Sequence, residues 1–121
     1  MSHPFAYCEL HTADAGRAKD FYRRLFDWKM NDIKTPMGPY TELEPGEGFP
    51  GGLTGTQPGT PSHWVAYVRV DDVRAATAKA RELGAQVLAD SHEVPDAGWF
   101  SLLVDPAGAR VGLWQPKAKT K

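Results

Sequence analysis

The chain contains two similar halves, and this internal repeat is the feature that most limits how it can fold. The first copy reads CELHTADAGRAKDFYRRLFDWKM, and the second reads AYVRVDDVRAATAKARELGAQVL. Three residue pairs share an offset of 58 positions: Asp14 and Asp72, Ala18 and Ala76, and Leu25 and Leu83. Gly52–Leu53 returns 60 positions later as Gly112–Leu113. Two copies are too few for a solenoid or propeller, so the sequence predicts a paired duplication around one cleft.

Composition and charge are those of an ordinary soluble domain. With 121 residues the chain is long enough to bury one hydrophobic core. Its 14 basic and 15 acidic residues give a net charge of −1. The only basic run is the tail 117–121, which is typical of a solvated chain end. We therefore expect no nucleic-acid partner.

The sequence also predicts a cytoplasmic location. Cys8 is the single cysteine, so no internal disulfide forms, as suits a reducing cytosol. No apolar stretch approaches the roughly 20 residues of a membrane span. The N-terminus lacks the basic and apolar regions of a signal peptide. We expect no membrane partner.

Hydrophobic periodicity predicts the same order of elements in each half. Alternation indicates a first strand over Phe5–His11, with Tyr7, Glu9 and His11 on one face. Thr12 or Asp14 is expected to cap a helix that follows. Its buried stripe is predicted to be Ala15, Ala18, Phe21, Tyr22 and Leu25. The remaining strands of this half are predicted at Trp28–Ile33, Tyr40–Glu44 and around Leu53.

The second half repeats this pattern. A strand is predicted over His63–Val70, and Asp71 or Asp72 is expected to cap a helix that ends at Gly84. The helix residues predicted to be buried are Val73, Ala76, Ala80 and Leu83. Three more strands are predicted at Gln86–Asp90, Trp99–Val104 and Arg110–Trp114. The fold class is therefore α+β, with the order βαβββ twice.

Domain boundaries follow from the repeat and from one Gly/Pro-rich stretch. We predict a single domain over residues 1–121, with module one at about 4–54 and module two at about 63–116. The linker is predicted at Gly55–Ser62, which permits the modules to pair within one chain or across a dimer.

Three motifs resemble those of the vicinal oxygen chelate (VOC) superfamily, which includes glyoxalase I, bleomycin-resistance proteins and extradiol dioxygenases. The first motif runs from Glu9 through Asp14, Phe21 and Tyr22 to Trp28. The second is Val70–Val73, and the third is Asp105-Pro106-x-Gly108-Ala109 leading to Leu113. The resemblance implies two βαβββ modules whose sheets form a curved mixed sheet around one cleft. It also implies that homodimers are common.

In metal-dependent members of this superfamily, four cleft residues bind one divalent metal. Carried onto this chain, those positions fall at Tyr7, Gly52, Val65 and Gly112. Glycine and valine side chains offer no lone pair, and hard divalent ions need several oxygen or nitrogen donors. The resemblance therefore leads us to expect no metal and no other cofactor, which argues against a glyoxalase I or dioxygenase mechanism.

Glu9 and His11 are the candidate catalytic residues. Lying two residues apart on one strand face, they are placed to act as a general base and its partner, or to hold a non-standard metal. In the alternative interpretation, Glu9 pairs with Arg69 or Tyr67 on the neighbouring strand and His11 is a polar wall residue. His3, His63 and His92 are given no catalytic role.

Aromatic residues dominate the rest of the predicted cleft, which favours a small, apolar or planar organic ligand. The predicted ligand-binding residues are Tyr7, Tyr40, Val65, Tyr67, Arg69, Trp99, Gly112 and Trp114. Packing in the core or a dimer interface is the alternative role for some of them. The sequence thus favours a metal-independent binding protein of the glyoxalase/bleomycin-resistance type. A glyoxalase-like lyase or isomerase using Glu9 or His11 is the second hypothesis, and an accessory module that binds a protein partner is the third.

Overall fold

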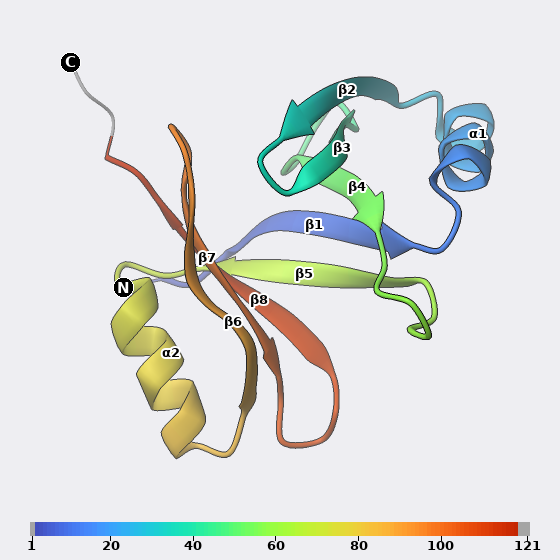
Figure 1. The fold of residues 1–121 in the computed structure, drawn as a ribbon. Helices are drawn as coiled ribbons and strands as arrows, with labels where there is room; N and C mark the ends of the chain where they lie inside the picture. Colours follow the sequence, from blue (N-terminus) through green and yellow to red (C-terminus); the bar gives the residue numbers. More distant parts are fainter. Residues whose placement is uncertain (1, 119–121) are drawn as a thin grey trace. The chain divides into compact units, whose positions relative to one another are not determined.

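The computed structural model describes residues 2–118 and contains two helices and eight strands in the order βαβββ–βαβββ (Figure 1). The elements of the first half are β1 (Phe5–Thr12), α1 (Ala15–Phe26), β2 (Lys29–Thr35), β3 (Gly38–Glu44) and β4 (Gly51–Gly55). Those of the second half are β5 (His63–Arg69), α2 (Val73–Glu82), β6 (Gln86–Val94), β7 (Gly98–Val104) and β8 (Arg110–Pro116). The predicted α+β class and the repeated element order are confirmed. Neither helix has the length and apolar character that crossing a bilayer would require.

The elements form two compact units. The first unit comprises Tyr7–Val65, and the second contains residues 66–118 together with 2–6. The short N-terminal segment belongs to the second unit because the Arg69 amide donates to the Pro4 carbonyl at 2.9 Å. The ring Nδ1 of His3 lies 3.1 Å from the Arg69 carbonyl oxygen and donates to it.

Both units arrange their strands in the same order. From its first strand outward, the first unit runs β1-β4-β3-β2 and the second unit runs β5-β8-β7-β6. The pairs β1–β4 and β5–β8 are parallel, and all other pairs within the units are antiparallel. Glu9 lies opposite Gly52 in the first unit, and Tyr67 lies opposite Gly112 in the second. The sequence repeat is therefore accompanied by an equivalent strand register in the two units.

The core of the first unit lies between α1 and one face of its sheet. Leu10, Leu43 and Leu53 form its buried centre, and α1 contributes Ala18 and Tyr22. Trp28 and Met30 complete the cluster. Asp14 caps α1 by accepting a hydrogen bond from the Arg17 amide, as predicted.

The predicted buried stripe of α1 is wrong for three of its five members. Phe21 and Leu25 are each 56% exposed, and Ala15 is exposed as well. The Tyr22 ring stacks on Trp28 with centroids 5.6 Å apart and meets Trp64 edge to face. These large rings fill the space beneath the helix, so that only the narrow line through Ala18 and Tyr22 reaches the core.

In the second unit, α2 is fixed by a buried polar contact. Asp72 caps the helix through the Ala75 amide, and Val73 and Thr77 are its buried residues. The Thr77 hydroxyl donates to the Val73 carbonyl at 2.6 Å and lies 2.7 Å from the Ser101 hydroxyl on β7. The prediction that Leu83 is buried is wrong, because Leu83 ends the helix and is 69% exposed.

Strand β6 continues beyond its predicted end at Asp90 to Val94. Its pairing with β7 is irregular between Ala89 and His92. Ser91 in this irregular stretch has a φ of 52°, and its amide donates to the Ser101 hydroxyl at 2.9 Å. A β-bulge of this kind lets a strand continue past residues that break the alternating pattern, which explains why alternation alone ended the strand too early.

Candidate functional site

A polar cluster lies on the face of the first unit's sheet opposite its hydrophobic core. Strand β1 presents Tyr7, Glu9 and His11, because alternate residues of a strand share a face. Strand β3 contributes Tyr40. Between these two strands runs β4, where Gly52 pairs with Glu9 on one side and with Glu42 on the other. The predicted catalytic pair and two of the predicted ligand-binding residues therefore form one cluster.

Hydrogen bonds join all four side chains. The Tyr40 hydroxyl donates to Oε2 of Glu9 at 2.7 Å, and Nε2 of His11 lies 2.7 Å from Oε1 of the same carboxyl. The hydroxyls of Tyr7 and Tyr40 are also in hydrogen-bonding contact. Glu9 thus occupies the centre of the cluster, with a phenol on one oxygen and an imidazole on the other.

Gly52 makes this arrangement possible because it has no side chain. A Cβ on residue 52 would lie 1.7 Å from the Tyr40 hydroxyl oxygen and 2.3 Å from that of Tyr7. Both distances are far shorter than any real contact, so the phenol groups occupy the space that a side chain at this position would fill. We attribute the glycine at this position to the close approach of the two tyrosines.

Burial keeps both phenols protonated. Removal from water raises the pKa of Tyr7 to about 12, with a further contribution from the nearby Glu9 carboxyl. Burial and the Glu9 carboxyl hold the pKa of Tyr40 far above its usual range. At neutral pH both residues are therefore hydrogen-bond donors rather than phenolates.

His63 joins this cluster although no sequence pattern assigned it a role. Its ring stacks on that of His11, with centroids 5.1 Å apart and an angle of 14° between the planes. Its Nδ1 donates to the Pro61 carbonyl at 2.8 Å, and its Nε2 is buried without a hydrogen-bond partner in the described structure. No local motif marks this contact, because the two histidines lie on different strands and meet only in the folded unit.

The remaining predicted ligand-binding residues are distributed as follows. Val65 is fully buried at the end of the first unit. In the second unit, the buried Tyr67 ring lies over Gly112, where an added Cβ would be 2.2 Å from the ring. Lys117 Nζ lies 5.3 Å from the centre of the Trp99 ring. The Trp114 ring packs near Gly98, and Arg69 is exposed. That these residues share one cleft with the first unit stays a prediction.

The residues present do not fit the divalent metal that the superfamily resemblance implies. In the first unit, the space at Gly52 is taken by the Tyr40 and Tyr7 hydroxyls. In the second, the space at Gly112 is taken by the Tyr67 ring. Within residues 2–118, no three His, Cys, Asp or Glu side chains come together as a metal site would require. Both glycine positions are thus covered by tyrosines, and neither offers a ligand.

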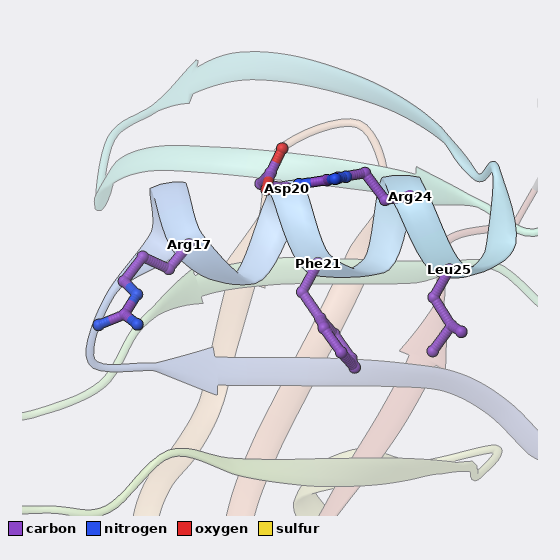
Figure 2. A pocket seen from close by; sticks show the side chains of 5 residues that line it. All are labelled: Arg17, Asp20, Phe21, Arg24 and Leu25. Atoms are coloured by element: carbon purple, nitrogen blue, oxygen red, sulfur yellow. Dashed lines mark hydrogen bonds and ion pairs between the residues drawn. The ribbon is translucent and has the colours of Figure 1, made fainter.

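Two surface hollows lie elsewhere on the first unit. One, of about 620 Å³, is lined by five α1 residues: Arg17, Asp20, Phe21, Arg24 and Leu25 (Figure 2). Phe21 and Leu25 project from the same side of the helix, whereas Asp20 and Arg24 lie together on another side. The other hollow, of about 410 Å³, lies near Asp27, Lys29 and Glu44. Neither contains a predicted site residue, so we take the polar cluster as the candidate site.

Sequence comparison identifies the family. Residues 7–113 match the family model described as a glyoxalase-like domain. The chain is 36% identical over 115 residues to a protein named "Putative glyoxylase CFP32" in Mycobacterium bovis, and equally to that of Mycobacterium tuberculosis. Each match covers 90% of this chain but only 44% of the relative. The chain therefore spans less than half the length of these curated relatives.

Structural comparison supports the same fold at low sequence identity. Methylmalonyl-CoA epimerase from Mycobacterium tuberculosis matches with a TM-score of 0.69 and 14% identity, over 94% of this chain and 88% of its own. A hypothetical protein, BH1468 from Bacillus halodurans, matches with a TM-score of 0.70 and 16% identity, over 100% and 99%. A Streptomyces coelicolor methylmalonyl-CoA epimerase in complex with 2-nitronate-propionyl-CoA matches with a TM-score of 0.67 and 17% identity, over 94% and 97%. These matches show the fold, and the family model over residues 7–113 shows that the chain belongs to the glyoxalase-like domain family, in agreement with the VOC resemblance.

Proposed function

We propose that this glyoxalase-like domain binds a small organic ligand without a metal, through the polar cluster of its first unit. The observation that supports this most directly is the position of the Tyr40 and Tyr7 hydroxyls in the space at Gly52. Because the Tyr7 and Tyr40 hydroxyls donate to Tyr40 and Glu9, they offer a ligand fixed hydrogen-bond-accepting oxygen atoms at the position where the metal-dependent relatives would offer a cation. Bleomycin-resistance proteins are the functional model, since they act by sequestering a ligand.

The side chains around the cluster indicate the chemistry of the ligand. Tyr7 and Tyr40 present ring surface as well as hydroxyls, and His11 adds a third flat ring. A planar molecule that carries at least one oxygen matches this combination of flat apolar surface and a few fixed polar groups. If the second unit contributes to the same cleft, Tyr67, Trp99 and Trp114 would add further aromatic surface.

This proposal is tested with protein that has been dialysed against EDTA and analysed for metals by mass spectrometry. We expect 2-naphthol, a planar aromatic probe, to bind saturably and to quench tryptophan fluorescence. Tyr40→Phe should weaken its affinity by about twofold to tenfold, which corresponds to one hydrogen bond of about 0.5–1.5 kcal/mol.

Tyr22→Phe is the matched control, because Tyr22 packs in the core on the other face of the same sheet. It should leave the affinity for 2-naphthol unchanged. The proposal fails if the EDTA-treated protein binds neither 2-naphthol nor its methyl ether, 2-methoxynaphthalene. It also fails if binding appears only after a divalent ion is added in a one-to-one ratio.

The second candidate function is a glyoxalase-like lyase or isomerase that uses Glu9 or His11 as a general base. The 2.7 Å contact between Glu9 and His11 favours it, because a carboxylate beside an imidazole is a common acid–base pair. The glyoxylase name of the curated relatives is consistent with it. The hemithioacetal of methylglyoxal and glutathione is the substrate to test first, and unchanged turnover in Glu9→Gln would remove this candidate.

We also propose that the protein is a cytoplasmic homodimer in which Gly55–Ser62 links the two modules. Exposed apolar side chains on α1, among them Phe21, Leu25 and Phe26, are consistent with a protein partner such as a second copy. Sedimentation equilibrium at micromolar concentration should give twice the mass of the chain. A mass equal to that of the monomer would contradict the dimer while leaving the ligand-binding proposal intact.

A further inference from the structure

The hydrogen bonds of the cluster determine which nitrogen of His11 carries the proton. Nε2 of His11 lies 2.7 Å from a carboxyl oxygen of Glu9, and the side chains are only 16% and 14% exposed. In this contact the carboxylate accepts, so Nε2 carries a proton. Of the two ring nitrogens, Nδ1 is then the one that can hold a lone pair, and no hydrogen bond to it is found within residues 2–118.

Glu9 is less suited than His11 to accept a proton from a ligand. The Tyr40 hydroxyl donates to one of its carboxyl oxygens, and the His11 ring donates to the other. A phenol has one proton, so the contact between the two tyrosines is donated by Tyr7 to Tyr40. The hydrogen bonds therefore point in one direction, from Tyr7 to Tyr40 and from Tyr40 to Glu9. They hold the Glu9 carboxylate in place beside His11.

The His63 ring stacks on the face of the His11 ring and fixes its plane. The two rings are nearly parallel, at 14°, with centroids 5.1 Å apart. The Pro61 carbonyl can only accept a hydrogen bond, so Nδ1 of His63 carries a proton, and its buried Nε2 has no hydrogen-bond partner among the described residues. The His11 ring is thus held at its edge by Glu9 and at its face by His63, as a side chain used for proton transfer requires.

We propose that Nδ1 of His11 receives the proton of an acidic hydroxyl on the ligand, and that Glu9, Tyr40 and His63 position it. This inference rests on the ligand-binding function proposed above and names the ligand class as planar phenols and enols. The O–H bond of the ligand breaks, its electron pair stays on oxygen, and the proton forms a second N–H bond on His11. The resulting imidazolium faces the Glu9 carboxylate on one side and the ligand oxyanion on the other.

The test compares 2-naphthol with 2-methoxynaphthalene, which has the same planar rings but no acidic proton. We expect the unaltered protein to bind 2-naphthol at least tenfold more tightly than the ether. The preference should disappear in His11→Phe, which keeps a ring to stack on His63. It should also disappear in Glu9→Gln, because the amide group can donate to Nε2 and move the ring proton to Nδ1.

Glu42→Gln is the matched control, because Glu42 lies beside Gly52 on the other neighbouring strand and bonds Asn31. It should keep the preference for 2-naphthol. Long-range ¹H–¹⁵N NMR reports which ring nitrogen of each histidine carries the proton. If the role of Glu9 were purely structural, Glu9→Gln would not change this signature. We expect the Nε2–H form for His11 and the Nδ1–H form for His63, with the His11 signature lost in Glu9→Gln.

The outcomes separate this inference from the function on which it rests. Equal affinity for the two naphthalenes overturns the role of His11 and leaves ligand binding intact. A preference that survives in His11→Phe, or an Nδ1–H form of His11 in the unaltered protein, also overturns it. Absence of binding for both compounds overturns the inference and the proposed function together.

Discussion

Single residues in this domain derive their importance from the atoms that surround them rather than from their chemical type. Gly52 and Gly55 lie on the same strand, but only Gly52 has tyrosine hydroxyls in the space where a Cβ would lie. Nothing lies within 4 Å of that space at Gly55. Glu9 likewise matters because Tyr40 and His11 converge on its two oxygens.

Gly52→Ala should therefore act on the candidate site directly. The new methyl group would collide with the Tyr40 and Tyr7 hydroxyls and displace the Tyr40 ring from Glu9. Crowding of this kind costs about 1–3 kcal/mol, which urea unfolding should detect. Gly55→Ala is the control and should change the free energy of unfolding by no more than about 0.5 kcal/mol. Equal effects of the two substitutions would show that the tyrosines do not depend on the gap at residue 52.

At the scale of elements, each unit joins its helix to its sheet in a different way. The first unit uses a hydrophobic cluster in which Leu53 is only 1% exposed. The second uses the Thr77–Ser101 contact, in which both side chains are fully buried. The repeat preserves the order and register of the strands, whereas the contacts between helix and sheet have diverged.

Two leucines of the first unit test the observed packing of α1. Leu53→Ala should destabilise the domain by about 2–5 kcal/mol, because it opens a cavity in the buried cluster. Leu25→Ala, on the side of α1 that is exposed in a single chain, should cost about 0.5 kcal/mol or less at a protein concentration low enough to keep the chain monomeric. Thermal or urea unfolding of the two variants measures the difference. A large loss in Leu25→Ala would mean that this side of α1 is covered in solution.

Ser101→Ala tests the polar junction of the second unit. The Ser101 hydroxyl accepts from the Ser91 amide and meets the Thr77 hydroxyl, so its removal leaves both groups without this partner. A buried polar group left unpaired costs about 1–3 kcal/mol. We expect that loss in the free energy of unfolding. Ser62→Ala, which removes a hydrogen bond at an exposed position, should cost much less. Comparable losses would argue that the Ser101 site is hydrated rather than dry.

For the whole molecule, three surface carboxyls distributed over both units are expected to contribute to acid stability. The Ala109 and Ala107 amides lower the pKa of Asp105 below its usual range. The Thr41 hydroxyl and Lys19 lower that of Asp32, and the Ser91 hydroxyl lowers that of Asp90. Each of these carboxyls binds protons more weakly in the folded than in the unfolded state.

The free energy of unfolding should therefore fall as pH decreases below the ordinary aspartate range of about 4. A carboxyl whose pKa is lower in the folded state stabilises the fold fully at pH values above its pKa in the unfolded state. This stabilisation is lost as the pH falls through the pKa of the folded state. Asp105→Asn has no proton to take up and should show a shallower decline. Urea unfolding at a series of pH values from 7 to 3 measures both slopes. Identical slopes for the unaltered protein and Asp105→Asn would exclude a contribution from the Asp105 carboxyl.

The sequence alone predicted the local structure and the family, because these depend on nearby residues. Alternation and helical periodicity gave the order of elements, Asp14 and Asp72 gave the helix caps, and the offset of 58 positions gave the duplication. It also brought Tyr7, Glu9 and His11 onto one strand face, since that grouping requires only the two-residue period of a strand.

Only the tertiary structure decided how residues far apart in the chain meet. Strand pairing brings Tyr40 within 2.7 Å of Glu9, places both tyrosine hydroxyls over Gly52, and stacks His63 on His11. It also leaves Phe21 and Leu25 exposed on a helix whose pattern predicted them to be buried. Periodicity defines the apolar residues of an element, whereas the size of the neighbouring rings defines how many of them reach the core. For this reason the repeat predicted the fold, and packing within one unit defined the candidate site.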